Sequence, residues 1–175
     1  MKNHLAAALL ILLGMAPALG EVPAPVPSID TLAQLPVVVA QPYDEKADAD
    51  AAVAAAFEKA RQSKKLVLLD LGGNWCPDCV VLANFLQLPE IKRFADKHYE
   101  IVSVDVGRFN RNLQVPARFG FTERLKGVPT VLVATPDGKL VNPGNVFAFT
   151  DARHMTPKAL ADYIAKWPQV SSAGP

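Results

Sequence analysis

The sequence predicts an α/β protein whose mixed central sheet, of about four to five strands, is flanked by helices on both faces. Two short, nearly continuous apolar runs, 66–71 and 99–106, are typical of strands buried on both faces. A helical pattern separates them, and two strands joined through a helix are normally parallel. The turn residues 136–139 precede a further strand from about Leu140, which should pair antiparallel with a strand over 130–134.

Four segments have the composition or spacing of helices, and they are 44–63, 76–87, 91–98 and 157–167. The first is rich in alanine with charged residues between, which is a strong helix pattern. Thr156 is placed to cap the last helix, and Pro157 suits its first position because the N–H that proline lacks would be unpaired there. The polar segment 107–120 predicts a loop with a helical part.

The first 20 residues have the pattern of a secretory signal peptide. Leu5 to Leu13 is an unbroken apolar run of nine residues, which is too short to cross a bilayer because a spanning helix needs about 20. Ala18 and Gly20 place small residues where a signal peptidase requires them, before Glu21. We therefore expect a periplasmic protein, with an uncleaved N-terminal anchor as the alternative.

The rest of the chain divides into a lead segment, one domain and a tail. Residues 21–43 contain five prolines and cannot form a regular helix or a central strand, so we expect an extended, partly flexible lead segment. Residues 37–39 are a candidate short strand within it. Residues 44–168 are long enough for one domain with its own core, and we expect 169–175 to be a flexible tail.

Composition and charge argue against several classes of function. Without Lys2, the remaining 17 Lys and Arg balance 17 Asp and Glu, so nothing favours binding to nucleic acid or to an anionic membrane surface. His98 and His154 lack ligand spacing to the two cysteines, and a structural zinc site usually needs four ligands. We therefore expect no bound metal.

The only two cysteines lie in the pentapeptide Trp75-Cys76-Pro77-Asp78-Cys79, directly after the strand at 66–71 and at the start of a helix. At a helix N-terminus, free N–H groups and the helix dipole stabilise a thiolate. A purely structural bridge between these cysteines would add little stability, because it closes a very small loop. A reactive thiol beside a second thiol predicts thiol–disulfide exchange.

With this motif, the chain resembles the thioredoxin-like family over roughly residues 44–167. The Trp-Cys-x-x-Cys motif follows a buried strand and opens a helix, as in that family. Asp70, six residues before Cys76, matches the family's buried acid. Residues 127–130 (Gly-Val-Pro-Thr) match the loop that carries its cis-proline. The segments 72–75 and 104–107 look closest to small exported bacterial members.

The resemblance implies a role for each of these residues. Cys76 would be the nucleophile, and Cys79 would resolve the mixed disulfide. Asp70, with a pKa raised by burial, would exchange a proton with Cys79, the alternative being an aspartate exposed at the strand end. The residues expected to contact the substrate are Trp75, Pro77, Asp78, Val128 and Pro129. For Trp75 a place in the core is the alternative.

Asp78 bears on the direction of the reaction. Its charge beside Cys76 should raise the pKa of that thiol, which predicts a moderately reducing couple. No dissociable cofactor is required. The expected partners are protein or peptide thiols and disulfides, with a membrane-embedded thiol reductant as a candidate electron source. A disulfide oxidant or isomerase, and a non-catalytic peptide-binding or chaperone module, are the alternatives.

Overall fold

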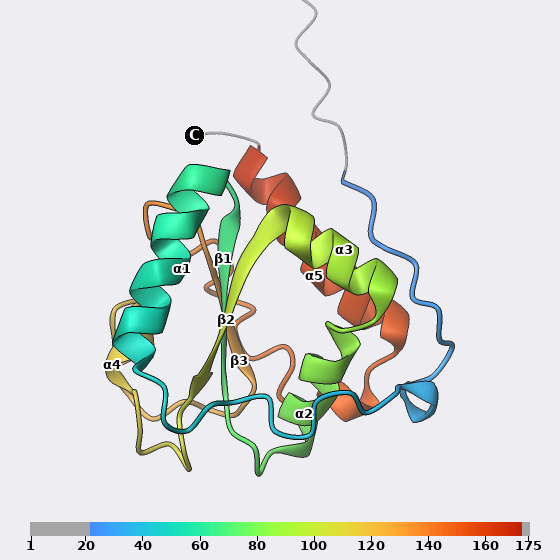
Figure 1. Ribbon diagram of the computed structural model, residues 1–175, viewed down its shortest axis with the longest axis horizontal. Coiled ribbons are helices and arrows are strands. Elements are labelled where there is room, and N and C mark those ends of the chain that lie inside the picture. Colours follow the sequence, from blue (N-terminus) through green and yellow to red (C-terminus); the bar gives the residue numbers. More distant parts are fainter. Residues whose placement is uncertain (1–21, 173–175) are drawn as a thin grey trace, which may run out of the picture.

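The apolar run at 66–71 forms β1 (Leu66–Gly72), and all seven of its residues are buried. The structure, a computed structural model, describes residues 22–172 (Figure 1). β1 is the central strand of a three-stranded sheet, between β2 (Tyr99–Asp105) and β3 (Thr130–Ala134). It pairs parallel with β2 and antiparallel with β3, so the predicted mixed sheet is confirmed.

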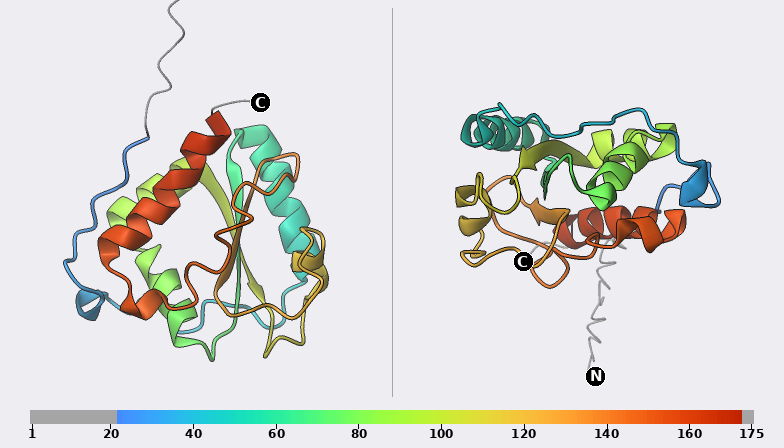
Figure 2. Two further views of the ribbon diagram at one scale, coloured as in Figure 1. Left: turned by 180° about the vertical axis from the view of Figure 1, so that it is seen from behind. Right: turned by 90° about the horizontal axis from the view of Figure 1, so that it is seen from below.

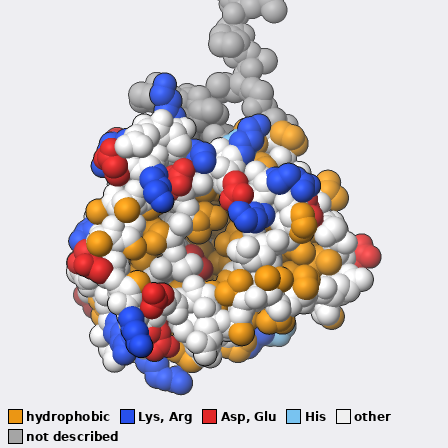
Figure 3. All heavy atoms as spheres, in the orientation of Figure 1, with side chains coloured by type: hydrophobic (Ala, Val, Ile, Leu, Met, Phe, Trp, Pro, Cys, Tyr) orange, Lys and Arg blue, Asp and Glu red, His pale blue; other side chains and the backbone are white. Residues whose placement is uncertain are grey.

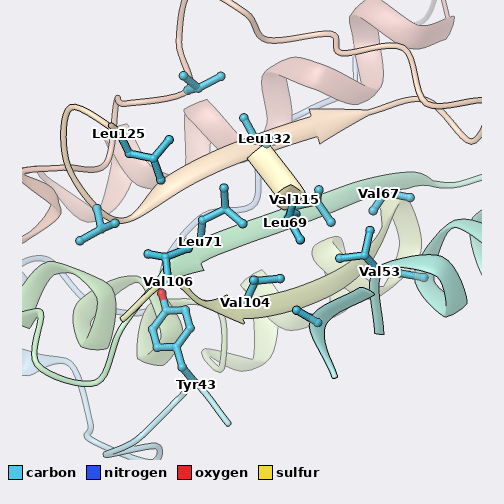
Figure 4. Close-up of a cluster of buried hydrophobic side chains, with 14 of the residues drawn as sticks. Tyr43, Val53, Val67, Leu69, Leu71, Val104, Val106, Val115, Leu125 and Leu132 are labelled. Atoms are coloured by element: carbon cyan, nitrogen blue, oxygen red, sulfur yellow. The ribbon is translucent and has the colours of Figure 1, made fainter. Parts of the chain in front are cut away.

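Helices cover both faces of this sheet, as predicted (Figures 1 and 2). The helix α1 (Ala49–Ser63) lies on one face, and α2 (Pro77–Phe85), α3 (Pro89–His98) and α5 (Pro157–Ser172) lie on the other. Alternate residues of β1 enter two separate apolar clusters because successive strand side chains point to opposite faces. Figure 4 shows the cluster beneath α1, which includes Val67, Leu69 and Leu71.

β2 differs from the prediction of a strand buried on both faces. Its two ends are buried, whereas its middle is partly exposed, with Ile101 38% exposed. The reason is position, because β2 is an edge strand with only β1 as a neighbour. An apolar run in the sequence does not distinguish an edge strand from a central one.

The strand expected from Leu140 is reduced to one isolated bridge between Ala134 and Leu140. The side chain of Asn142 takes the place of a further strand along the outer edge of β3. Its Nδ2 donates to the carbonyl oxygen of Val131 at 2.8 Å, and its Oδ1 accepts from the backbone N–H of Val133 at 2.8 Å. The sheet of the described residues therefore has three strands, and the prediction of four to five was too high.

Replacing Asn142 with alanine should destabilise the fold markedly. The change leaves two buried backbone groups of β3 without partners, so the free energy of unfolding should fall by about 2–4 kcal/mol. Denaturant unfolding of Asn142→Ala measures this. The exposed Asn145 offers a matched control, because Asn145→Ala should stay within about 0.5 kcal/mol of the parent protein. Equal decreases in the free energy of unfolding for the two variants would contradict the role of Asn142 at the edge of β3.

The helices begin and end close to the predicted positions. α1 starts at Ala49 rather than at residue 44, because Asp48 caps it by accepting a hydrogen bond from the N–H of Ala51 at 3.0 Å. The helical part expected within 107–120 is the short α4 (Gln114–Ala117). Two 3-10 turns, η1 (Leu32–Gln34) and η2 (Ala152–His154), complete the secondary structure of the described chain.

The ends of the chain are described only in part. α5 continues past Pro168 to Ser172, so the tail expected from residue 169 is helical as far as the structure describes it. The signal peptide expected over 1–20 lies outside the described residues. Within 22–172, none of the helices is both long enough and apolar enough to cross a membrane.

The lead segment is extended and docked on the domain. It runs beside α3 and passes α2 before reaching α1 (Figure 1). The strand considered at 37–39 does not form. Instead, Oδ1 of Asn84 in α2 accepts from the N–H groups of Val38 and Val39 at 2.6 and 2.8 Å, and its Nδ2 donates to the carbonyl of Val39 at 2.9 Å. One buried asparagine therefore fastens the lead segment to α2.

Candidate functional site

The two cysteines lie at the start of α2 and are both free thiols. Cys76 is the N-cap residue, and its sulfur accepts a hydrogen bond from the N–H of Cys79 at 3.2 Å. Pro77 occupies the first helical position, as expected. Cys76 is only 3% exposed, against 0% for Cys79. A substrate sulfur can therefore approach Cys76 only through a small opening.

The two thiols have opposite pKa shifts. The pKa of Cys76 is lowered, chiefly because the Cys79 thiol donates a hydrogen bond to it, with help from the N–H groups of Cys79 and Asp78. Burial and the charge of Asp78 act in the other direction without prevailing. The pKa of Cys79 is raised well above its ordinary value by its contact with Cys76, by burial and by the charge of Asp70. Ionisation is thus favoured at Cys76 and disfavoured at Cys79.

Asp70 lies in β1 and is 1% exposed. Burial raises the pKa of Asp70 to about 7, and one hydrogen bond, from Tyr43, opposes this rise. These results confirm the predicted buried acid rather than an aspartate at an open strand end. A carboxyl group that titrates near neutral pH can both accept and return a proton there.

Tyr43 is a residue of this site that the sequence did not reveal. It is 2% exposed, and its hydroxyl donates to Oδ1 of Asp70 at 2.9 Å. Its backbone is held by Asn74, whose Oδ1 accepts from the Tyr43 N–H at 3.0 Å and whose Nδ2 donates to the Tyr43 carbonyl at 2.9 Å. The only signal in the sequence is an aromatic residue that follows Pro42 in a lead segment otherwise free of aromatics.

Gly72 provides the space in which these groups meet. A Cβ atom at this position would lie 2.3 Å from the hydroxyl oxygen of Tyr43 and 2.8 Å from the sulfur of Cys79. Both distances are far shorter than a carbon atom allows. The glycine at the end of β1 is therefore required for the phenol and the thiol to lie side by side.

The loop before β3 lies against Cys76. The Val128–Pro129 peptide bond is cis, as the resemblance implied. The carbonyl oxygen of Val128 lies 3.5 Å from the sulfur of Cys76 and can accept a hydrogen bond from its thiol. Both loop residues are buried. The structure thus brings Val128 and Pro129 to the redox motif from about fifty residues away in the chain.

Trp75 is a surface residue, so the alternative of a core aromatic is wrong. It is 40% exposed, and its Nε1 donates to the carbonyl of Gly107 at 2.7 Å. The rings of Trp75 and Phe109 pack edge to face, with 6.0 Å between their centroids. Two cations stack on this pair, with Arg108 4.9 Å from the Trp75 ring and Arg124 4.2 Å from the Phe109 ring. An aromatic surface bordered by positive charge therefore adjoins the cysteines.

Asp78 does not lie where the sequence analysis placed it. We expected it to contact the substrate, but it is only 5% exposed. Its Oδ1 accepts from the backbone N–H of Arg153 at 3.0 Å and lies 3.7 Å from Nε of that side chain. Asp78 thus joins α2 to η2, whereas its neighbour Pro77 is exposed. Among residues 22–172, no group of three or more His, Cys, Asp and Glu side chains is arranged to hold a metal ion.

Comparison with known proteins agrees with this geometry. The model of a thioredoxin-like family matches residues 48–136, which include both cysteines, Asp70 and Pro129. A disulphide isomerase from Xylella fastidiosa Temecula1 has a solved structure that is 36% identical in sequence. The match has a TM-score of 0.67 and covers 71% of this chain and 95% of that one.

A second solved structure, a DsbH oxidoreductase, is 22% identical with a TM-score of 0.41, covering 57% of this chain and 82% of that one. This likeness is too weak to support an inference. The chain matches none of the curated proteins significantly. The family match spans half of the chain and contains its redox motif, and the chain therefore belongs to the thioredoxin-like family.

Proposed function

We propose that this protein is an exported thiol–disulfide oxidoreductase that reduces disulfides of proteins or peptides. The observation that carries the proposal is the pairing of a Cys76 thiol with a lowered pKa and a buried Cys79 thiol with a raised pKa. Such a pair separates an attacking thiol from a resolving thiol. The contact of the Val128 carbonyl with Cys76 and the family membership support the same chemistry.

The first step is attack by the Cys76 thiolate on one sulfur of the substrate disulfide. A bond forms between that sulfur and Cys76, the substrate S–S bond breaks, and the other substrate sulfur leaves as a thiolate. Stabilisation of the thiolate at the N-cap of α2 makes Cys76 the attacking atom. The product is a mixed disulfide, and the departed thiolate takes a proton from water.

The second step needs Cys79 to lose its proton. Asp70, ionised above a pKa of about 7, is the buried base available to accept it. The Cys79 thiolate then attacks the sulfur of Cys76 and expels the second substrate sulfur. Two electrons have moved to the substrate, and the protein holds a Cys76–Cys79 disulfide. An external dithiol must reduce this disulfide again, and we propose a membrane-embedded thiol reductant for that purpose.

Substrate would lie along the loop before β3. The backbone of Val128, next to Cys76, suits pairing with an extended peptide segment. Trp75 and Pro77 are the exposed neighbours of Cys76 in the chain, so both would contact the residues that flank the substrate cysteine. A periplasmic location is part of the proposal, and the signal-like pattern of residues 1–20 supports it.

The equilibrium reduction potential of the Cys76–Cys79 couple tests the proposed direction. We expect a value nearer to the roughly −270 mV of thioredoxin than to the roughly −120 mV of a strong oxidant. The reason is that the charge of Asp78 and the burial of Cys76 offset part of the lowering of its pKa by hydrogen bonds, so the thiolate should be less stabilised than in a strong oxidant. Equilibration with glutathione or dithiothreitol buffers gives the value. A potential near that of the strong oxidant would reverse the assigned direction.

Isomerisation of disulfides is the second candidate, because the 36% identical relative is described as a disulphide isomerase. An isomerase needs only Cys76 to open and reform substrate disulfides, whereas net reduction needs Cys79 as well. A scrambled substrate protein separates the two activities. Recovery of native disulfides by Cys79→Ala, with no gain in free substrate thiols, would favour isomerisation.

A further inference from the structure

Tyr43 reaches the redox centre from outside the segment that carries the family motif. It lies at the end of the lead segment, and its ring points toward Leu71 and Val106 in the core (Figure 4). Two asparagines set its position, Asn74 through the Tyr43 backbone and Asn84 through Val38 and Val39. Hydrogen bonds thus hold the lead segment on both sides of the redox motif, and its one aromatic side chain lies beneath the cysteines.

The hydroxyl of Tyr43 contacts two of the groups that must exchange a proton. It donates to Oδ1 of Asp70 at 2.9 Å. It also lies beside the sulfur of Cys79, because both atoms are within 3 Å of the point where a Gly72 side chain would begin. The Tyr43 hydroxyl therefore bonds the base of the second step and lies close to its thiol.

We propose that Tyr43 is a positioning residue of the redox centre, which orients the Asp70 carboxylate toward Cys79 and thereby links the docked lead segment to resolution of the mixed disulfide. The inference rests on the proposed function and extends it to a segment outside the family match, which begins at residue 48. The phenol stays protonated at working pH, because burial and the charges of Asp70 and Cys79 raise the pKa of Tyr43. It therefore acts as a permanent hydrogen-bond donor.

A cavity that Asp70 helps to line adjoins the site. It has a volume of about 260 Å³ and opens between β2, α3 and the lead segment, on the face that Figure 3 shows. Asp70 and Ser103 line it, as do Lys92 and Asp96 of α3, which form an ion pair with each other at 2.7 Å. Through this cavity, Asp70 can exchange the proton taken from Cys79 with solvent.

These contacts give a specific expectation for pH dependence. The Tyr43 hydrogen bond favours the ionised carboxylate, so removing it should raise the pKa of Asp70 further. The groups around this carboxyl are Tyr43 from the lead segment, Cys79 from α2, and the Lys92–Asp96 pair across the cavity. Among these groups of the described chain, the Tyr43 hydroxyl is the one that forms a hydrogen bond with the carboxylate.

The test is Tyr43→Phe in the full chain, which keeps the ring and removes only the hydroxyl. A carboxyl-carbon NMR titration should show the Asp70 midpoint moving up by about one pH unit. The Cys79-dependent release of product from a preformed mixed disulfide should slow about three- to tenfold at pH 6.5 and recover at pH 9. The pH profile of Cys76 alkylation should stay unchanged within about 0.3 unit.

Two controls separate this role from a structural one. Tyr99→Phe removes the hydroxyl of another buried tyrosine, which donates to the carbonyl of Ile164 away from the cysteines. This variant should change neither the Asp70 titration nor the pH dependence of product release. Adding Tyr43→Phe to Asp70→Asn should produce no further change in the pH profile of release. An additive change in the double variant, or an unmoved Asp70 titration in Tyr43→Phe, would overturn the inference.

The NMR titration needs no substrate, so the inference can fail while the proposed function stands. If the parent protein reduces disulfides and Tyr43→Phe has the parent profile, only the role of Tyr43 is lost. If the parent protein reduces none but the Asp70 midpoint shifts, the Tyr43–Asp70 coupling stands and the proposed function is wrong.

Discussion

Cys79→Ala should stop the reaction at the mixed disulfide and leave substrate covalently attached to Cys76. The variant retains the N-cap thiol that attacks, but it lacks the sulfur that attacks next. In a single turnover without added thiol, product release should fall at least about 1,000-fold, because water does not cleave a disulfide at a comparable rate. Mass spectrometry of the protein after mixing with a peptide disulfide measures the trapped adduct.

Cys76→Ala is the matched control for this experiment. It should form no adduct, because the remaining thiol at position 79 is 0% exposed, and burial and the charge of Asp70 still raise its pKa after the contact with Cys76 is lost. Equal adduct yields from the two variants would mean that the thiols are not divided into an attacking and a resolving one. The absence of an adduct in both would favour the peptide-binding or chaperone alternative over an exchange enzyme.

The reactive part of the site was predictable because its signals are local. Cys76 and Cys79 lie directly after a buried strand, at the start of a helix, and Asp70 lies within that strand. The periodicity of one strand and one helix therefore predicts where all three residues lie. The buried Asp70 was expected from the apolar run around it and by resemblance, and the cis bond before Pro129 was expected by resemblance alone; the structure has both. Local pattern therefore located the cysteines and supported the buried acid, and the resemblance located the loop.

The remaining features depend on contacts between distant segments. Tyr43 is brought to Asp70 by a lead segment whose prolines indicate only that it is extended. Asp78 lies beside Cys76 in the sequence, but Arg153 draws its carboxylate toward η2. The two residues of the first pair lie 27 positions apart in the chain and those of the second pair 75 positions apart. Periodicity in a single sequence does not indicate contacts over such separations. Sequence reasoning consequently overstated Asp78 as a substrate contact and missed Tyr43.

The sheet shows the same limit in the fold. Turn chemistry at 136–139 and the apolar residues after it correctly indicated a chain reversal after β3. It could not indicate that a buried side chain, Asn142, would bond to the edge of β3 in place of a fourth strand. An asparagine in a loop is ordinarily a turn residue, and only its three-dimensional position shows that it completes a sheet edge.

Asp70→Asn should make the protein more stable and less active at neutral pH. The pKa of Asp70 is about 7 in the folded protein, against an ordinary value of 3.8 when unfolded. Below the lower value the group is protonated in both states, and the wild-type protein has its full stability. Between the two values only the unfolded chain loses the proton, so the free energy of unfolding decreases as pH rises through this window. Above pH 7 the decrease is complete.

The variant has no such ionisation, so its advantage over the parent should grow from almost nothing near pH 4 to a few kcal/mol at pH 8. A shift of about three pH units corresponds to roughly 4 kcal/mol. Residual structure in the unfolded chain reduces the difference between the two pKa values, so about 2–4 kcal/mol is the expected range. Denaturant unfolding of the reduced proteins at several pH values measures it. Asp30→Asn, which changes an exposed aspartate, should show no comparable growth.

Activity should change in the opposite direction. Without a base for Cys79, resolution of the mixed disulfide at pH 7.5 should slow about 100-fold, whereas attack by Cys76 should change little. A variant that gained stability with pH but kept its resolution rate would show a buried carboxyl that takes no part in the proton transfer. A gain in stability together with a loss of resolution rate in Asp70→Asn would show that the chain retains a destabilising charge in its core because the second half of the exchange needs it.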